Sequence, residues 1–204
     1  MIKAILAGLF IALGAMGSQM CPDKYVGAAV FPVGLILCYF VGANLFTGKN
    51  LMIMDVLSKK RTVSGLIGKL SMFWVGNLIG AGVVGTVVNV SGIISNTDNI
   101  LYKASLSPGE LIVKGIFCNI CVCLAVYGAM QSKSEIGKLA LLYFPTFLFV
   151  LCGFEHCVAD MYYFSAVGNG LFTPEFWYVQ AFSLIGNLIG GLGIGALLHK
   201  KGVI

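Results

Sequence analysis

The same five residues, Gly-Asn-Leu-Ile-Gly, occur twice in this sequence, at positions 76–80 and 186–190. Each copy lies inside a long apolar segment, at a corresponding place in its own half of the chain. Such a repeat indicates an internal duplication, and duplicated membrane folds usually surround a transport path. The sequence therefore predicts one domain over residues 1–204, built from two related halves at about 1–95 and 104–204.

The composition places the chain in the membrane. Hydrophobic residues make up 58% of the sequence and charged residues only 10%, which is far more apolar than a soluble core and surface require. A helical span takes roughly 20 apolar residues, so 204 residues allow about six crossings and leave no room for a soluble catalytic module. We expect an all-α integral membrane protein that contacts the lipid bilayer and is not an enzyme.

The net charge of +5 does not indicate a nucleic-acid partner. In a soluble chain it would favour one, but here the basic residues lie at the ends of apolar segments, where the positive-inside rule explains them. With six crossings, one side of the membrane receives the clusters Lys59, Lys60 and Arg61, then Lys133 and Lys138, then Lys200 and Lys201, while Asp23, Asp98 and Glu175 fall mostly opposite. Both termini are therefore predicted to be cytoplasmic.

The seven cysteines indicate buried thiols and not a disulfide framework. The number is odd, and most of them lie in apolar stretches, as Cys118 does. Cys121 and Cys123 lack the spacing of a metal site. No metal or other cofactor is expected.

Six apolar segments can be drawn, at 2–20, 26–56, 66–90, 111–130, 139–164 and 176–198. The first lacks the small-residue cleavage site of a signal peptide and is read as a retained span. Residues 107–110 (Ser-Pro-Gly-Glu) and 173–175 (Thr-Pro-Glu) put a capping hydroxyl and a proline at the starts of the fourth and sixth segments. Ser132 with Glu135 predicts a similar cap before the fifth segment.

The second and fifth segments are longer than one span and carry polar or glycine-rich residues at mid-membrane, at 42–50 and 153–160. A Phe-Pro pair precedes each interruption, at 31–32 and 144–145. Broken backbone at membrane depth is tolerated only where protein or a water-lined cavity satisfies its amides and carbonyls. Paired broken helices in two halves predict a permeation site at these positions.

Several motifs resemble the formate/nitrite transporter family over nearly the whole chain. They are Leu-Phe-Thr at 45–47, Gly-Phe-Glu-His at 153–156 with Ala159, and Cys-Asn at 118–119 with residues 122–126. The resemblance implies a pentamer of aquaporin-like protomers, each with two inverted three-helix repeats and its own anion pore. Two departures bear on pore charge and gating: Asp160 stands where the family usually has Asn, and the family's amphipathic amino-terminal helix is almost entirely missing.

The resemblance also implies roles for individual residues. His156 would be the central pore residue, Thr47 its hydrogen-bonding counterpart, and Lys103 a vestibule lysine that draws anions in. Glu155 and Asn119 would support the broken loops. The apolar constrictions would be formed on the cytoplasmic side by Leu35, Leu45 and Phe46, and on the periplasmic side by Phe31, Phe149 and Phe154.

The residues themselves leave other interpretations open. His is the side chain whose proton equilibrium moves most easily across neutral pH, yet a lone intramembrane His can also make only a structural hydrogen bond. Thr47 can satisfy a local carbonyl, Lys103 can be an interfacial lysine, and Asp160 can line the pore or pair with a backbone amide. Glycines spaced four apart in the repeated motif predict close helix packing within one protomer.

The expected function is a channel or proton-coupled transporter for small monovalent weak-acid anions, of the formate, nitrite and hydrosulfide class, in the bacterial inner membrane. Its partners would be the anion and protons. The alternative is an aquaporin-like pore for a neutral small solute, but the Asn-Pro-Ala pair is absent and Lys103 before a central His suits an anion better. An enzyme is disfavoured because the only histidines are His156 and His199 and no His-Glu-x-x-His motif or carboxylate pair is visible.

Overall fold

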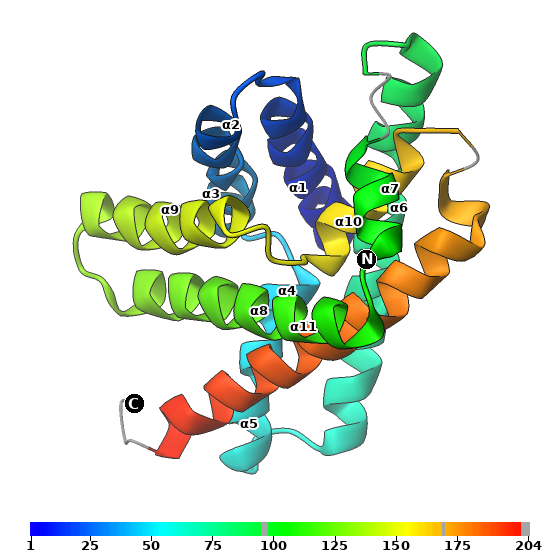
Figure 1. The fold of residues 1–204 in the computed structure, drawn as a ribbon. Coiled ribbons are helices and arrows are strands. Elements are labelled where there is room, and N and C mark those ends of the chain that lie inside the picture. Colours follow the sequence, from blue (N-terminus) through cyan, green and yellow to red (C-terminus); the bar gives the residue numbers. More distant parts are fainter. Residues whose placement is uncertain (95–97, 169, 201–204) are drawn as a thin grey trace.

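A computed structural model describes residues 1–94, 98–168 and 170–200, and every regular element in these ranges is a helix (Figure 1). Lys201 and the side chain of Asp98, both assigned to a side of the membrane by the charge pattern, lie outside the described part. The elements of the first half are α1 (Ile2–Met20), α2 (Lys24–Val30), α3 (Pro32–Val41), α4 (Phe46–Lys49), a 3₁₀ turn (Asn50–Met52), α5 (Ile53–Leu57) and α6 (Val63–Ser91).

The rest of the chain begins with a short helix that the sequence did not predict. Its elements are α7 (Asp98–Ser105), α8 (Pro108–Gln131), α9 (Glu135–Leu151), α10 (Cys157–Ser165), a 3₁₀ turn (Gly170–Phe172) and α11 (Pro174–Lys200). Among the described residues, five stretches are long and apolar enough to cross a membrane: Ile2–Met20, Lys24–Val41, Val63–Ser91, Pro108–Gln131 and Pro174–Lys200.

Of the three helix caps predicted from the sequence, two are present in the structure. Ser107 and Glu110 form a complete capping box at α8, and Thr173 Oγ1 accepts the Phe176 N–H (3.3 Å) at α11. The predicted Ser132 cap of α9 is wrong, because Ser134 is the cap and accepts the Gly137 N–H (3.2 Å). Ser132 instead accepts the Ser134 N–H (3.3 Å) and so closes the turn before the helix.

The chain leaves the helical conformation between α3 and α4 and again between α9 and α10, and the two stretches have the same backbone. Gly42 ends α3 and Gly153 follows α9, both with left-handed φ values of 70° and 65°. The Ala43 N–H bonds to Cys38 O (2.8 Å) and the Phe154 N–H bonds to the carbonyl of Phe149 (3.0 Å), which is the six-to-one bond of a Schellman cap. A short extended stretch then leads into α4 or α10.

The two Phe-Pro pairs have different roles in the structure. Pro32 is the first residue of α3 and separates it from α2, a position where its missing N–H costs nothing. Pro145 lies inside the continuous helix α9. There the Thr146 hydroxyl donates to Leu142 O (2.7 Å) in the same turn.

The repeated motif packs helices together within the protomer, as predicted. The two most extensive helix contacts are α1 with α6 and α8 with α11. A Cβ added at Gly80 would overlap the Ile5 carbonyl oxygen, and one added at Gly190 would overlap the Ile116 carbonyl oxygen. Only glycine lets the backbones approach this closely.

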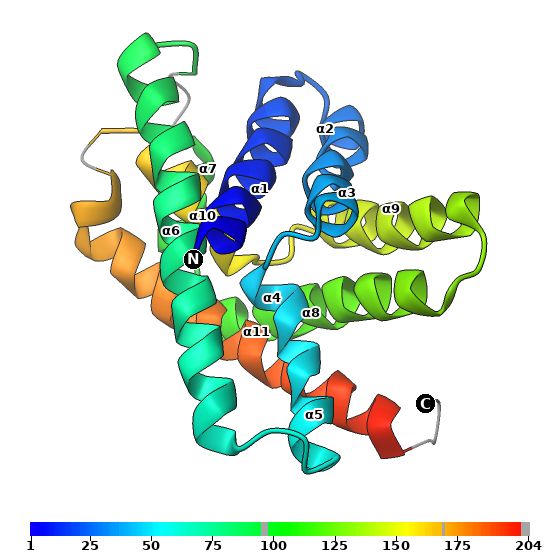
Figure 2. The same ribbon diagram turned by 180° about the vertical axis from the view of Figure 1, so that it is seen from behind.

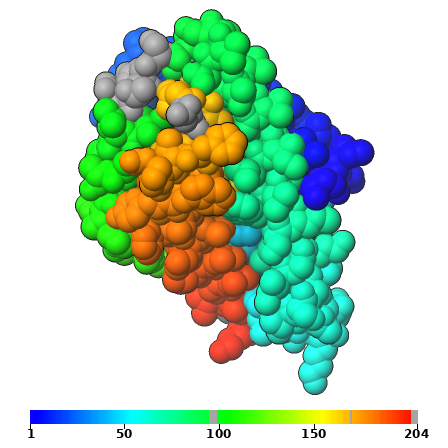
Figure 3. Space-filling model, turned by 90° about the vertical axis from the view of Figure 1, so that its right-hand side faces the viewer, coloured from blue at the N-terminus to red at the C-terminus, as the bar shows by residue number. Residues whose placement is uncertain are grey.

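A basic loop lies at one end of the molecule (Figures 1 and 2). The α5–α6 loop, with Lys59, Lys60 and Arg61, lies at the same end as the carboxyl end of α11. The α1–α2 loop and the start of α11 lie toward the opposite end. Both α6 and α11 are visible on the face shown in Figure 3. These two helices expose large apolar side chains, including Val83, Val87, Ile185 and Ile189.

Candidate functional site

The asparagine of the first repeated motif holds the break between α3 and α4. Asn77 is fully buried in α6, and its Oδ1 accepts the N–H of Phe46, the first residue of α4 (2.8 Å). Its Nδ2 donates to Ala4 O in α1 (2.7 Å) and to Asn44 O in the extended stretch (3.1 Å). One side chain therefore satisfies a helix-start amide and two carbonyls that the break leaves unpaired.

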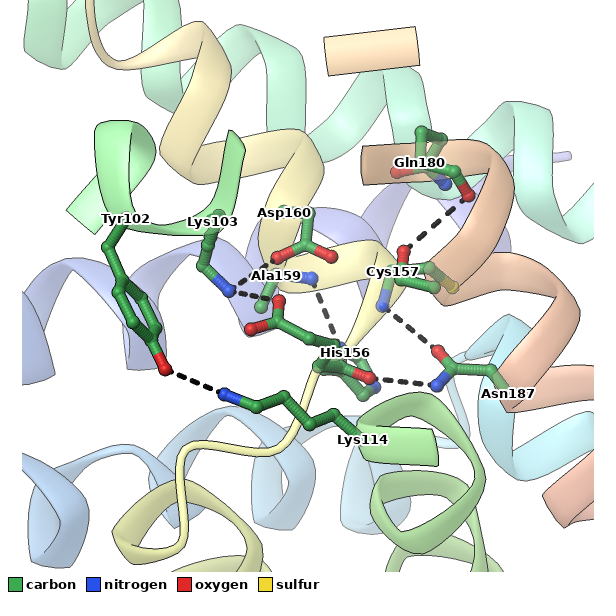
Figure 4. Close-up of polar contacts among 11 residues, drawn as sticks. Tyr102, Lys103, Lys114, His156, Cys157, Ala159, Asp160, Gln180 and Asn187 are labelled. Carbon is green, nitrogen blue, oxygen red and sulfur yellow. Dashed lines mark hydrogen bonds and ion pairs between the residues drawn. The ribbon is translucent and has the colours of Figure 1, made fainter. Parts of the chain in front are cut away.

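The asparagine of the second motif makes the same set of contacts (Figure 4). Asn187 Oδ1 accepts the Cys157 N–H at the start of α10 (2.9 Å), and its Nδ2 donates to Gly115 O in α8 and to Glu155 O, both at 2.8 Å. In the amide orientation that satisfies its neighbours, Gln180 also donates to Cys157 O (3.0 Å). The backbone that precedes and starts α10 is thus fixed from α11.

This fixed backbone presents His156 to the centre of the protomer. His156 is the amino-terminal cap of α10, and its Nδ1 accepts the Ala159 N–H (3.1 Å). A nitrogen that accepts a hydrogen bond carries no proton, so the ring hydrogen lies on Nε2. Nε2 lies 3.0 Å from Thr47 Oγ1 at the start of α4 and donates to it.

Aromatic rings cover one side of this pair. The His156 ring stacks on Phe149 with centroids 5.8 Å apart, and Phe149 meets Phe31 edge to face at 5.5 Å. Phe154 stacks on Phe117 at 5.6 Å. His156 and these three predicted residues, Phe31, Phe149 and Phe154, line a cavity of about 420 Å³ that reaches the α1–α2 loop. This cavity is called the first vestibule below.

A second cavity, of about 430 Å³, lies on the α5 side of the pair and is called the second vestibule. Leu35 and Leu45, two of the predicted cytoplasmic constriction residues, line it together with Lys49. Phe46, the third, is buried beside them in the core but does not line either cavity. Thr47 is fully buried between the two vestibules, where its carbonyl accepts the Cys123 thiol (3.5 Å).

Lys103 lines the first vestibule, but it is not a free cation (Figure 4). Its Nζ contacts Glu155 Oε2 and Asp160 Oδ1, the latter at 2.9 Å, and lies 5.4 Å from the centre of the Tyr163 ring. Burial alone lowers the pKa of Lys103, but the carboxylates of Asp160 and Glu155 outweigh burial and raise it above its ordinary value. Lys103 is therefore charged and doubly paired.

Asn119 and Glu155, expected to support the broken loops, contact different parts of the site. Asn119 Nδ2 donates to the Asn187 carbonyl (2.6 Å) and so reaches the second asparagine through its backbone. Glu155 lies in the loop before His156, where its carbonyl is held by Asn187 and its side chain by Lys103. Asp160 pairs with a side chain, Lys103, and not with a backbone amide.

Sequence reasoning missed the two asparagines and the pairing of Asp160. The repeated motif itself carried the signal for Asn77 and Asn187, because a polar residue repeated inside an apolar segment requires buried partners. The pairing of Asp160 with Lys103 was harder to predict. The two residues are far apart in sequence, and the helix that carries Lys103, α7, was not predicted. All seven cysteines are free thiols, with Cys152 exposed. Within the described ranges, no cluster of His, Cys, Asp and Glu is arranged to hold a metal ion.

The chain is similar to known transporters over most of its length. The formate/nitrite transporter family model matches residues 1–200. A probable formate transporter of Methanothermobacter thermautotrophicus is 31% identical over 239 residues, covering 97% of this chain and 86% of the relative. The formate channel FocA of Escherichia coli (strain K12) is 31% identical over 195 residues, covering 85% and 68% of the two chains.

Two solved structures have the same fold. An FNT family ion channel superposes with a TM-score of 0.85 at 22% identity, over 98% of this chain and 87% of that one. A pentameric formate channel with formate bound superposes with a TM-score of 0.81 at 24% identity, over 100% and 96% of the two chains. The family match over nearly the whole chain and the shared fold lead to one conclusion: this chain belongs to the formate/nitrite transporter family.

Proposed function

We propose that the chain forms a channel or proton-coupled transporter for small monovalent weak-acid anions, of the formate, nitrite and hydrosulfide class. The observation that carries this proposal is the hydrogen bond between His156 and Thr47, buried between two vestibules. Family membership and relatives named as formate channels or transporters support the anion class.

The architecture proposed for this function has six spans in two inverted halves, about 1–95 and 104–204. The second span would consist of α2 to α5 and the fifth of α9 and α10, each broken at its left-handed glycine. The equivalent contacts of Asn77 and Asn187 support this pairing of the halves. An irregular backbone in the membrane needs such internal partners.

The transport path would run from one vestibule to the other past His156 and Thr47. Phe31, Phe149 and Phe154 would narrow it on the first side, and Leu35, Leu45 and Phe46 on the second. A bare anion loses much of its hydration in such an apolar passage, so the passage must supply hydrogen bonds or neutralise the anion. The His156–Thr47 pair is the polar group placed to do so.

The hydrogen-bond geometry favours His156 as a neutral donor. Protonating its second nitrogen would break the bond from the Ala159 N–H, which also caps α10. An anion can instead receive the Nε2 hydrogen now given to Thr47, while the Thr47 hydroxyl turns to donate as well. Two donors then replace part of the lost hydration at the narrowest point.

Assembly and location are proposed from the same comparisons. A homopentamer with one pore per protomer is supported by the pentameric formate channel of the same fold. The exposed apolar faces of α6 and α11 suit lipid or neighbouring protomers. The basic α5–α6 loop would face the cytoplasm of a bacterial cell, with both termini on the same side of its inner membrane.

The decisive experiment measures stopped-flow uptake into proteoliposomes of formate, nitrite, hydrosulfide and glycerol. We expect rapid anion flux and slow glycerol flux from the wild type. His156→Asn should change formate flux by about tenfold, the effect of losing a positioned hydrogen bond to a charge. His199→Asn, at the end of α11, is the matched control and should transport like the wild type.

The competing proposal is an aquaporin-like pore for a neutral solute. It predicts glycerol flux as fast as anion flux, with no dependence on His156. That outcome would overturn the anion channel. Thr47→Val, which keeps shape and removes the hydroxyl, should reduce anion flux less than His156→Asn, because the imidazole N–H remains.

A further inference from the structure

The first vestibule contains more buried negative charge than buried positive charge. Lys103 has an exposed fraction of 6%, Glu155 of 2% and Asp160 of 0%, and both carboxyl groups contact the same ammonium nitrogen. One cation balances one carboxylate. A second ionised carboxylate in this place would be a buried charge without compensation, which proteins avoid by binding a proton.

Among the residues that the structure describes, the groups around Asp160 offer no second cation. Lys103 reaches it from α7, and Glu155 lies in the preceding loop with His156. Tyr163 and Cys157 lie on its own helix, Cys118 on α8 and Ser183 on α11. From α1 and α6, the partners of α10 are uncharged: Gln19 bonds Tyr162, and the Ala81 carbonyl accepts Ser165.

We infer that Asp160 and Glu155 together hold one exchangeable proton beside Lys103, and that this proton sets the charge of the first vestibule. With the proton bound, Lys103, Glu155 and Asp160 are together neutral. Without it they carry one negative charge on the wall that an anion must pass to reach His156. This inference rests on the proposed anion channel, and it makes Asp160 a residue that regulates anion access.

The direction in which pH changes anion flux follows from the charge of the first vestibule. Lowering the pH on the first-vestibule side fills the proton site and removes the repulsion, so anion flux rises. Raising the pH empties the site, and flux falls. Asp160→Asn leaves Lys103 and Glu155 as a neutral pair with no proton to exchange, so that variant should lose this part of the pH dependence.

The test compares initial formate flux into proteoliposomes at acidic and at neutral external pH. The ratio of the two fluxes in the wild type is divided by the same ratio in Asp160→Asn, which cancels the protonation of formate itself. We expect a value of about five, the effect of one unit charge several ångströms from the anion in a partly hydrated cavity. Asp23→Asn removes a carboxylate at the rim of the same cavity and should keep the wild-type ratio.

Infrared difference spectra of the purified protein, recorded between the two pH values, detect the bound proton independently of transport. The wild type should show the C=O stretch of a protonated carboxylic acid at acidic pH, and Asp160→Asn should lose it. Absence of this band in the wild type, or equal pH ratios in wild type and Asp160→Asn, would overturn the inference. Absence of anion flux with the band present would instead contradict the proposed function alone.

Discussion

The breaks that follow α3 and α9 share a backbone and differ in the side chains that they carry. Aligning Gly42 with Gly153 pairs Asn44 with Glu155, Leu45 with His156, and Lys49 with Asp160. The glycine turns and the asparagine contacts are the same in both. The two breaks therefore share a scaffold, while the residues that this scaffold presents differ.

This divergence makes the two vestibules electrostatically unlike. In the first, Lys103 contacts two carboxyl groups, those of Glu155 and Asp160. In the second, Lys49 is half-buried and makes no ion pair within the described residues, although Asp55 lines the same cavity and pairs with Arg61 (3.5 Å). Equivalent backbone positions therefore carry an acidic residue, Asp160, beside the first vestibule and a basic residue, Lys49, beside the second.

The largest expected effect tests whether the two breaks depend equally on their asparagines. Asn77→Leu or Asn187→Leu leaves one amide and two carbonyls unpaired in the interior, and each should cost about 2–5 kcal/mol of stability. Thermal unfolding of the detergent-solubilised protein measures this. Asn89→Leu, on the exposed end of α6, is the control, and if all three variants unfolded alike the shared role would be refuted.

A smaller loss of stability is expected when the closely packed glycines of the repeated motif are replaced. Gly80→Ala and Gly190→Ala should each destabilise the protein by about 1–3 kcal/mol, because the new methyl group meets a carbonyl oxygen of the neighbouring helix. Gly68→Ala in the same helix as Gly80 meets open space and should be neutral or slightly stabilising. Unequal losses at Gly80 and Gly190 would show that the two halves pack differently.

Replacing the glycine of either turn should lower the free energy of unfolding by about 1 kcal/mol. Gly42→Ala and Gly153→Ala meet no neighbouring atom, so their cost is that of holding a non-glycine residue at positive φ. Thermal unfolding again measures it. If Gly153→Ala altered formate flux and Gly42→Ala did not, the two turns would differ in function, because only the Gly153 turn leads to His156.

The smallest effect is expected at Lys49. Lys49→Gln removes the unpaired cation of the second vestibule and should weaken the apparent affinity for formate about two- to fivefold, with substrate supplied from that side of oriented vesicles. Lys3→Gln, which removes a nearby cation that does not line this cavity, is the control. An equal change from both sides would contradict a separate anion site at this mouth.

Much of the helix arrangement follows directly from the chain. Residues 2–20 were predicted to form one helix and do so as α1, and the turns of the breaks occur where glycine interrupts apolar sequence. Local hydrogen bonding set these features, so local sequence predicted them. The prediction of a Ser132 cap was wrong for a local reason too. Both Ser132 and Ser134 precede α9, and only Ser134 adjoins its first turn.

Contacts between residues far apart in the sequence were harder to predict. His156 and Thr47 were paired only through the family resemblance, because they lie in different halves and no spacing rule connects them. Lys103 was expected as a free attractant for anions, and its position beside Asp160 depends on the short helix α7 folding over α10. Residues that repeat in a sequence can be paired by inspection, but residues that diverged cannot.

A membrane-embedded, all-helical chain could be predicted from the residues alone, because apolar length is a property of the chain itself. Only the tertiary structure decided what the repeated asparagines do and how the charges of the first vestibule are paired. The physical reason is that hydrogen bonds and ion pairs between helices require positions in space. Asn187 satisfies groups of α8 and α10, and Lys103 meets Asp160, only after the helices have packed.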